Sequence, residues 1–332
     1  MDKVSSRLIS GVRGFASALL ALLIIMAITF LVVALPPGDF VDGYISKRAQ
    51  GGFVVTKDEA DALRAQLGLD QPQAVHFLRW MGGVLTGDFG YSWEFRRPVL
   101  DVILERAPIT FAILGLTAVA VYALSIAVAV AYLFAGPLVT RLLDAFALTG
   151  LSVPNFIIAL CLVYLLSSSG WVDLSRWSML SQQVGLSWWS TFLSLIWIPV
   201  LTLSWSSLML HSRTIRAAAA VETAKDYYIS LRLIGVGRLT LLRGYVLRPM
   251  LIPTVSTLGW DVAAILSATP VVSAILGTPD LGSLLVTSAS SGDLYLTAGI
   301  VLVFAMLVLA GTQVSRILLR VLTRGSVTGA SG

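Results

Sequence analysis

The chain has 332 residues, of which 57% are hydrophobic and only 12% are charged, and its mean hydropathy is +0.86. A soluble globular domain carries about 25% charged residues, so this composition excludes an ordinary soluble protein. Several windows of about 20 residues are almost free of charge, which is the length needed to cross the hydrocarbon core of a bilayer. We therefore expect a membrane protein.

The apolar runs predict the fold class. Backbone polar groups in lipid must form hydrogen bonds within their own segment, and the runs show no two-residue alternation, so we expect helices. The predicted fold is an all-α membrane protein with six transmembrane helices. The predicted spans are residues 15–35, 109–135, 145–167, 188–210, 250–276 and 294–315.

Charge is distributed unevenly between the two sides of these spans. With six spans, both termini lie on the same side as segments 136–144 and 211–249. These four regions hold 14 basic and 4 acidic residues, whereas the opposite side holds 9 basic and 13 acidic residues. The positive-inside rule therefore places both termini in the cytoplasm. The net charge of +5 is a consequence of this topology and predicts no nucleic-acid partner.

Residues 36–108 form the largest predicted extracytoplasmic segment. Thr56 and Glu59 are spaced as a capping box, which predicts that a helix begins there. A second, apolar helix is expected over residues 73–85, on the membrane surface or against the spans. The sequence GDFGYS that follows predicts a turn, and Pro108 is expected near the start of the next helix, where proline is tolerated.

The chain offers little for catalysis or for metal binding. It has no Walker A pattern, so we expect no ATPase site of its own and no enzymatic activity. The single Cys161 cannot form an internal disulfide. His76 and His211 fall on opposite sides of the predicted membrane and cannot share a metal site. We therefore predict no metal and no cofactor in this chain.

Residues 217–238 interrupt the apolar runs with AAAAVETAKDYYISLRLIGVGR. One stripe of a predicted short cytoplasmic helix carries Ala220, Ala224, Tyr227, Leu231 and Ile234. Charged residues occupy its other faces: Glu222, Lys225, Asp226 and Arg232. The spacing of Thr223 and Asp226 allows a capping box, and Gly235 and Gly237 permit a left-handed turn that ends the helix. The stripe must pack against helix ends of this chain, lipid or a partner.

Asp261 is the one charged residue inside a predicted span. An ionisable group there is costly and usually faces a cavity or a partner. It is either a polar residue that lines a pathway or a residue near the interface that is bonded to a neighbouring helix, with Trp260 marking the interface. The residues alone leave both alternatives open.

An ordered set of short motifs resembles one family across nearly the whole chain. The motifs are LGLDQP at 67–72, Trp80 followed by GDFGYS at 87–92, ERAPIT at 105–110, DAFALTGLSVPNFIIAL at 144–160, DYYISLRLIGVG at 226–237, MLIP at 250–253 and GTPDLGSLL at 277–285. The set resembles an inner-membrane permease subunit of the dipeptide/oligopeptide (peptide/nickel) class of binding-protein-dependent ABC importers. Here Leu231, Leu233 and Ile234 replace the small and basic residues usual in the loop of that family.

The resemblance implies a type I ABC importer permease fold in the bacterial inner membrane. Its organisation would be an N-terminal helix and extracytoplasmic segment over 1–108, a core permease domain over 109–320 with the coupling loop 211–249, and a cytoplasmic tail over 321–332. Asp261, in the fifth span, would line the translocation pathway. The residues implied to couple the chain to an ATPase are Glu222, Ala224, Asp226, Tyr227, Leu231, Ile234, Gly235 and Gly237.

The resemblance also implies partners and a substrate class. We expect a homologous second permease subunit, two cytoplasmic ATPase subunits or domains that hold ATP and Mg²⁺, an extracytoplasmic solute-binding protein and membrane lipid. The expected cargo is a short peptide, with oligosaccharides and nickel chelates as alternatives. A non-transporting membrane sensor or scaffold is the other class considered, but the predicted cytoplasmic segments are too short for an output domain.

Overall fold

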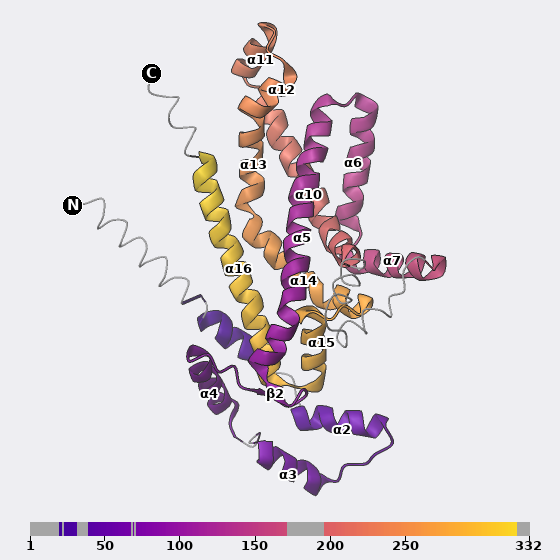
Figure 1. Cartoon of the computed structure of the whole chain (residues 1–332), viewed down its shortest axis with the longest axis vertical. Coiled ribbons are helices and arrows are strands. Elements are labelled where there is room, and N and C mark those ends of the chain that lie inside the picture. Colours follow the sequence, from indigo (N-terminus) through magenta and orange to yellow (C-terminus); the bar gives the residue numbers. More distant parts are fainter. Residues whose placement is uncertain are drawn as a thin grey trace, which may run out of the picture. The chain divides into compact units, whose positions relative to one another are not determined.

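The structure is a computed structural model that describes residues 20–21, 23–31, 39–67, 69, 71–170 and 196–323. The chain is mostly helical, as expected (Figure 1). Parts of the predicted first and fourth spans, and most of the predicted tail, lie outside the described residues. Residues 23–31 of the first predicted span are helical.

The described elements follow one another in this order. The helices are α2 (Phe40–Gln50), α3 (Lys57–Leu67), α4 (Gln73–Leu85), α5 (Val99–Phe134), α6 (Pro137–Ser152), α7 (Asn155–Ser169), α10 (Trp197–Thr223), α11 (Asp226–Leu233), α12 (Arg238–Leu241), α13 (Leu247–Ser256), α14 (Leu258–Leu276), α15 (Leu281–Ser291) and α16 (Leu294–Thr323). A π-helical turn, η1 (Leu242–Val246), joins α12 to α13. Strands β1 (Tyr91–Ser92) and β2 (Arg97–Pro98) form a short antiparallel hairpin that the all-α prediction did not include.

The chain divides into two compact units. Unit 1 contains residues 1–110 and 280–307, and unit 2 contains residues 111–279 and 308–332. The predicted boundaries at 1–108, 109–320 and 321–332 were drawn from membrane topology. The two units are defined by proximity within the fold, so they do not test those boundaries. The two units are described in turn.

In unit 1, the predicted capping box is present at the start of α3. The Thr56 amide donates to Glu59, and the Glu59 amide donates back to the Thr56 hydroxyl at 3.3 Å. Arg64, on the same helix, forms ion pairs with Asp39 and Asp42 beside α2. Burial alone would raise the pKa of Asp39, but its hydrogen bonds from Arg64 and from the backbone outweigh that effect and lower the pKa. These contacts hold α3 against the start of α2.

Unit 1 also contains the β-hairpin and the start of α16. The buried Asp293 carboxylate accepts hydrogen bonds from the Ser92 hydroxyl at 2.6 Å and from the amides of Glu94 and Leu296. Burial raises the pKa of Asp293, although these hydrogen bonds oppose the shift. The carboxylate therefore anchors the hairpin to the first turn of α16, where an acidic group suits the helix dipole.

Two of the predicted spans are each divided into two helices in unit 2. The predicted third span becomes α6 and α7, which separate at Val153 and Pro154 because proline disfavours helical geometry in the residue before it. Figure 1 shows α7 running across the direction of α6. The predicted fifth span becomes α13 and α14, which separate at Thr257. Uninterrupted spans over 145–167 and 250–276 were therefore wrong.

Two predicted helix boundaries were also wrong. Helix α5 begins at Val99, so Pro108 lies inside it and not near its start. Helix α10 continues past residue 210 to Thr223, so the first residues of the predicted cytoplasmic loop are helical. Among the described residues, three helices are long and apolar enough to cross a membrane: α5, α14 and α16.

Candidate functional site: an exposed two-turn helix and a buried carboxylate

The predicted helix over residues 217–238 is broken in the structure. Helix α10 ends at Thr223, and α11 begins at Asp226 after Lys225, which has extended backbone angles. Ala220 and Ala224 therefore do not share a helix with Tyr227, and the single stripe was wrong. The predicted capping box was also wrong, because α11 has no side-chain cap and the Thr223 hydroxyl bonds back to the Ala220 carbonyl.

Glu222 joins the two helices across this break. Its buried carboxylate accepts from the Lys225 ammonium at 2.7 Å and from the Tyr227 hydroxyl. Residues five apart do not share a face of a continuous helix, so the bond to Tyr227 requires the break. Burial would raise the pKa of Glu222, but the two hydrogen bonds outweigh it and lower the pKa. Burial, followed by the bond to Glu222, raises the pKa of Tyr227.

Helix α11 itself has no buried residue, although five of its eight residues are aliphatic or aromatic. At its end, the side chains of Leu233 and Ile234 are 81% and 77% exposed. These two neighbouring side chains at the end of α11 form a small apolar surface that the described residues leave uncovered. Isolated exposed apolar residues are common, but paired ones at a helix end suit docking of a partner.

The turn after α11 has the geometry of a Schellman motif. Gly235 has a φ of 89°, and its amide bonds to the Arg232 carbonyl while the Val236 amide bonds to the Leu231 carbonyl. This pattern satisfies the last carbonyl groups of the helix, and the left-handed position favours glycine. Gly237 instead has a φ of −63° and immediately precedes α12, so only one of the two glycines needs the left-handed region.

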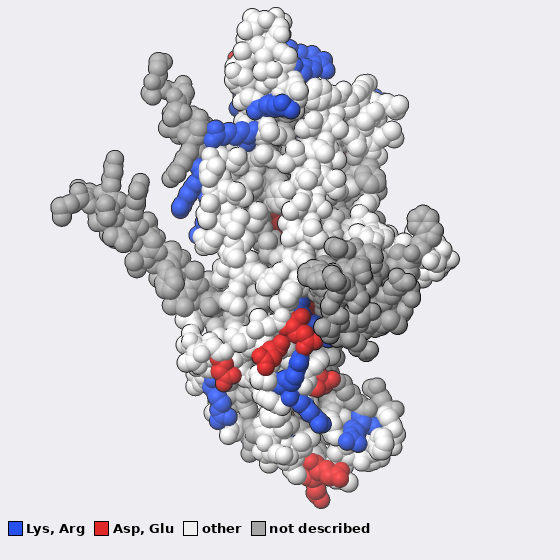
Figure 2. Space-filling model, in the orientation of Figure 1, with Lys and Arg blue, Asp and Glu red and all other residues white. Residues whose placement is uncertain are grey.

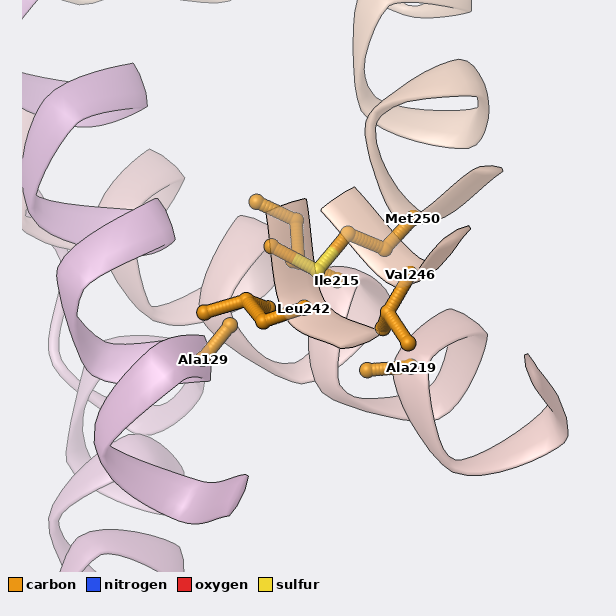
Figure 3. Close-up of a cluster of buried hydrophobic side chains, with 6 residues drawn as sticks. All are labelled: Ala129, Ile215, Ala219, Leu242, Val246 and Met250. Atoms are coloured by element: carbon orange, nitrogen blue, oxygen red, sulfur yellow. The ribbon is translucent and has the colours of Figure 1, made fainter. Parts of the chain in front are cut away.

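A buried apolar cluster supports the exposed helix from below. Its members come from α5, α10, η1 and α13, and they are Ala129, Ile215, Ala219, Leu242, Val246 and Met250 (Figure 3). Tyr228 of α11 packs against the cluster, and the ring of Tyr227 lies 5.9 Å from that of Tyr245 in η1. Helix α11 is therefore attached to the ends of α5, α10 and α13 through its two tyrosines.

Basic side chains gather at the same end of unit 2. Figure 2 shows Lys and Arg around α11 and α12. Arg216, on the last turns of α10, forms an ion pair with Asp144 of α6 and lies over the ring of Tyr132. Arg248 donates to the carbonyls of Val321 and Leu322 at the end of α16. This end of the unit therefore has the basic character that the positive-inside rule assigns to a cytoplasmic face.

Asp261 lies on α14, 5% exposed, among groups from three helices. Its carboxylate accepts from the Tyr122 hydroxyl of α5 at 2.7 Å, and His211 Nε2 of α10 lies 2.9 Å from its other oxygen. The Thr257 hydroxyl is 3.4 Å away, and the rings of Tyr122 and His211 stack at 5.4 Å. Asp261 is thus bonded to neighbouring helices, which was one of the two predicted alternatives.

Asp261 also faces a cavity of about 310 Å³ in unit 2, as the other alternative requires. The walls come from the end of α6, the start of α7, α10 and α14. That this cavity belongs to a translocation pathway stays a prediction. Among the described residues, no cluster of three potential metal ligands occurs here or elsewhere.

The sequence reasoning missed His211 and Tyr122. His211 falls one residue beyond the predicted fourth span, so it was assigned to a loop, whereas it is 2% exposed within α10. The available signal was the polar sequence HSRTIR, in which the amphipathic helix continues into the predicted loop. Tyr122 had no distinguishing signal, because a tyrosine inside an apolar helix is unremarkable without its partner.

The three helices among the described residues that are long and apolar enough to cross a membrane define a multi-pass membrane protein. Comparison with known families specifies this class further. Residues 122–326 match the family of binding-protein-dependent transport system inner membrane components, and residues 8–114 match the N-terminal region of the same membrane components. The chain belongs to this family and is a permease subunit of the inner membrane.

Individual relatives agree with this assignment. The chain is 30% identical to a glutathione transport system permease protein of Salmonella paratyphi A, over 86% of this chain and 88% of that protein. It is 28% identical to a putative peptide permease protein of Brucella suis, over 87% and 89%. It is 26% identical to a probable peptide ABC transporter permease protein of Sinorhizobium fredii, over 85% and 87%.

Proposed function

We propose that this permease forms half of the translocation pathway of an ABC importer of short peptides. The names of the three relatives, two for peptides and one for the tripeptide glutathione, support the peptide class. The proposed complex contains a homologous second permease, two cytoplasmic ATPase subunits or domains that bind ATP and Mg²⁺, and an extracytoplasmic solute-binding protein. The chain contributes no ATPase site, which agrees with the lack of a Walker A pattern.

The observation that carries the coupling role is the exposed end of α11 above the buried apolar cluster. Leu233 and Ile234 offer an apolar surface to an ATPase, while Tyr227 and Tyr228 tie the same helix to α5, α10 and α13. When a partner moves this helix, the motion therefore passes directly to the ends of α5, α10 and α13. Motion of this kind rotates the spans and alternates access to the pathway.

The proposed membrane arrangement has six spans with both termini in the cytoplasm. The charge asymmetry of the sequence and the basic end of unit 2 support this orientation. In this arrangement α11 and its flanking turns face the ATPases, and Asp261 lies on the pathway. The chain supplies helices that line the pathway in two alternative conformations and the coupling helix α11, and the ATPases hydrolyse ATP.

The substrate class is tested with the partner solute-binding protein and with transport. Calorimetry measures binding of the purified partner to panels of short peptides, oligosaccharides and nickel chelates, and liposomes that contain the assembled importer measure ATP-driven uptake. We expect micromolar or tighter peptide binding together with peptide uptake. Binding of sugars or nickel chelates without any peptide binding would overturn the peptide assignment and leave the permease assignment unchanged.

A further inference from the structure

We infer that the cavity beside Asp261 is a binding subsite for an organic ammonium group, and that it holds the amino terminus of the transported peptide. The second clause rests on the proposed function, whereas the first does not. The residues that line the cavity include Asp261, Trp260, Ser152, Ser206 and Ser207. A carboxylate, an aromatic ring and small hydroxyls together suit a primary ammonium.

The first step of the argument is the charge of the site. A carboxylate buried among apolar helices is costly unless a cation or several hydrogen bonds compensate it. The Tyr122 hydroxyl donates to Asp261 at 2.7 Å, whereas the Thr257 hydroxyl, 3.4 Å from the carboxylate, donates to the Thr254 carbonyl at 2.8 Å. Among the residues that the structure describes, no Lys or Arg lies within ion-pair distance of Asp261, and none lines the cavity.

The second step concerns His211, which is the basic group nearest to Asp261. Although Nε2 is 2.9 Å from the carboxylate, neither ring nitrogen of this buried imidazole has a partner with hydrogen-bond geometry among the described residues. His211 therefore gives the Asp261 carboxylate no hydrogen bond, and the Tyr122 hydroxyl is the bonded neighbour of that carboxylate on the packed side of the helices.

The third step is access from the cavity. Trp260 is 71% exposed and adjacent to Asp261, so its indole is not committed to packing within the described part of this chain. The hydroxyl of Ser206 donates to Asn155 at 2.7 Å, while Ser207 is half-buried on the cavity wall. The volume of about 310 Å³ accommodates an aminoacyl group with its ammonium. An amino terminus passing through the cavity would thus meet the carboxylate and the indole together.

The charge of the cavity is measured without transport by thiol labelling. A Ser207→Cys substitution is placed in a Cys161→Ala background, and the assembled importer is studied in nanodiscs. The labelling rate with cationic 2-aminoethyl methanethiosulfonate is divided by the rate with the neutral 2-hydroxyethyl reagent. We expect this ratio to fall about tenfold when Asp261→Asn is added, because a unit charge a few ångströms away raises the local cation concentration.

Matched variants separate the charge of Asp261 from general effects. Asp144→Asn removes a carboxylate of the same unit that pairs with Arg216 in a different cavity, and it is expected to leave the ratio unchanged. Ethylammonium chloride, compared with sodium chloride, is expected to slow labelling by the neutral reagent when Asp261 is present. If Asp261→Asn fails to assemble, Trp260→Leu is tested in its place. We expect this variant to weaken about threefold the protection that ethylammonium gives against labelling by the neutral reagent.

The outcomes distinguish the subsite from the proposed function. Equal ratios with Asp261 and with Asp261→Asn, or no protection by ethylammonium, would overturn the ammonium subsite. A high ratio in an importer that takes up no peptide would support the subsite and overturn the peptide proposal. With peptide transport present, Asp261→Asn is expected to lower the turnover of a peptide with a free amino terminus about tenfold at saturating binding protein.

Discussion

The left-handed turn at Gly235 gives the sharpest prediction for coupling. A β-carbon built at this residue meets no atom within 4 Å, so a side chain there costs only its conformational strain. At a φ of 89° that strain is about 1–2 kcal/mol for an L-residue, with β-branched side chains at the upper end. A penalty of this size lowers the population of the native turn by about 5–30-fold relative to alternatives that release it.

The assay compares three substitutions at this one position. Gly235→Asn, Gly235→Ala and Gly235→Val are introduced into the importer and reconstituted in liposomes, and peptide uptake is divided by ATP hydrolysed. Because asparagine tolerates the left-handed region, we expect uptake per ATP to be near normal for Asn, reduced for Ala and reduced at least about fivefold for Val. Amide hydrogen exchange in α11 should rise in the same order.

A comparison two residues away tests the reasoning. Gly237 has a φ of −63°, so Gly237→Ala carries no left-handed strain and should cost less than Gly235→Ala. The reasoning would be refuted if Gly235→Val coupled normally. It would equally be refuted if Asn and Val were impaired to the same extent, since that result would indicate a need for space at a docked surface and not for a positive φ.

Three further predictions concern other parts of the chain. Gly292→Ala should lower the free energy of unfolding by ~1–3 kcal/mol more than Gly87→Ala does, which a comparison of thermal unfolding checks, because both glycines have positive φ but only the first would place a β-carbon against a main-chain oxygen, at 2.9 Å. Since the pKa of Glu222 is lowered in the folded state, its contribution is present above the ordinary value of 4.5 and is lost as pH falls through the lowered pKa; hydrogen exchange in α11 should increase there, and Glu222→Gln should abolish that transition. Val54→Cys and Arg238→Cys, in a background without the native cysteine, should react from opposite sides of the membrane with an impermeant thiol reagent, and equal labelling of both in intact cells without an outer-membrane barrier would contradict the proposed orientation.

The sequence was enough to predict those structural features that depend on interactions between residues close together in the chain. The capping box of Thr56 and Glu59 joins residues three apart, so its two hydrogen bonds are visible in the spacing. The turn at Gly235 follows from the freedom of glycine. The apolar runs similarly predicted the long helices α5 and α16, because bilayer thickness sets a minimum length that few other structures need.

The tertiary structure decided the features that depend on distant partners. The break between α10 and α11 contains neither Gly nor Pro, and the bonds of Glu222 to Lys225 and Tyr227 accompany it. The surroundings of Asp261 come from Tyr122 and His211, which are 139 and 50 positions away in the chain. By itself, the sequence determined that the chain is a helical membrane protein with a glycine-ended loop, because composition and short-range spacing carry that information, and its ordered motifs showed the resemblance to a permease family. Only the tertiary structure decided which groups surround the buried carboxylate, because helix packing brings together residues whose separation in sequence carries no signal of their contact.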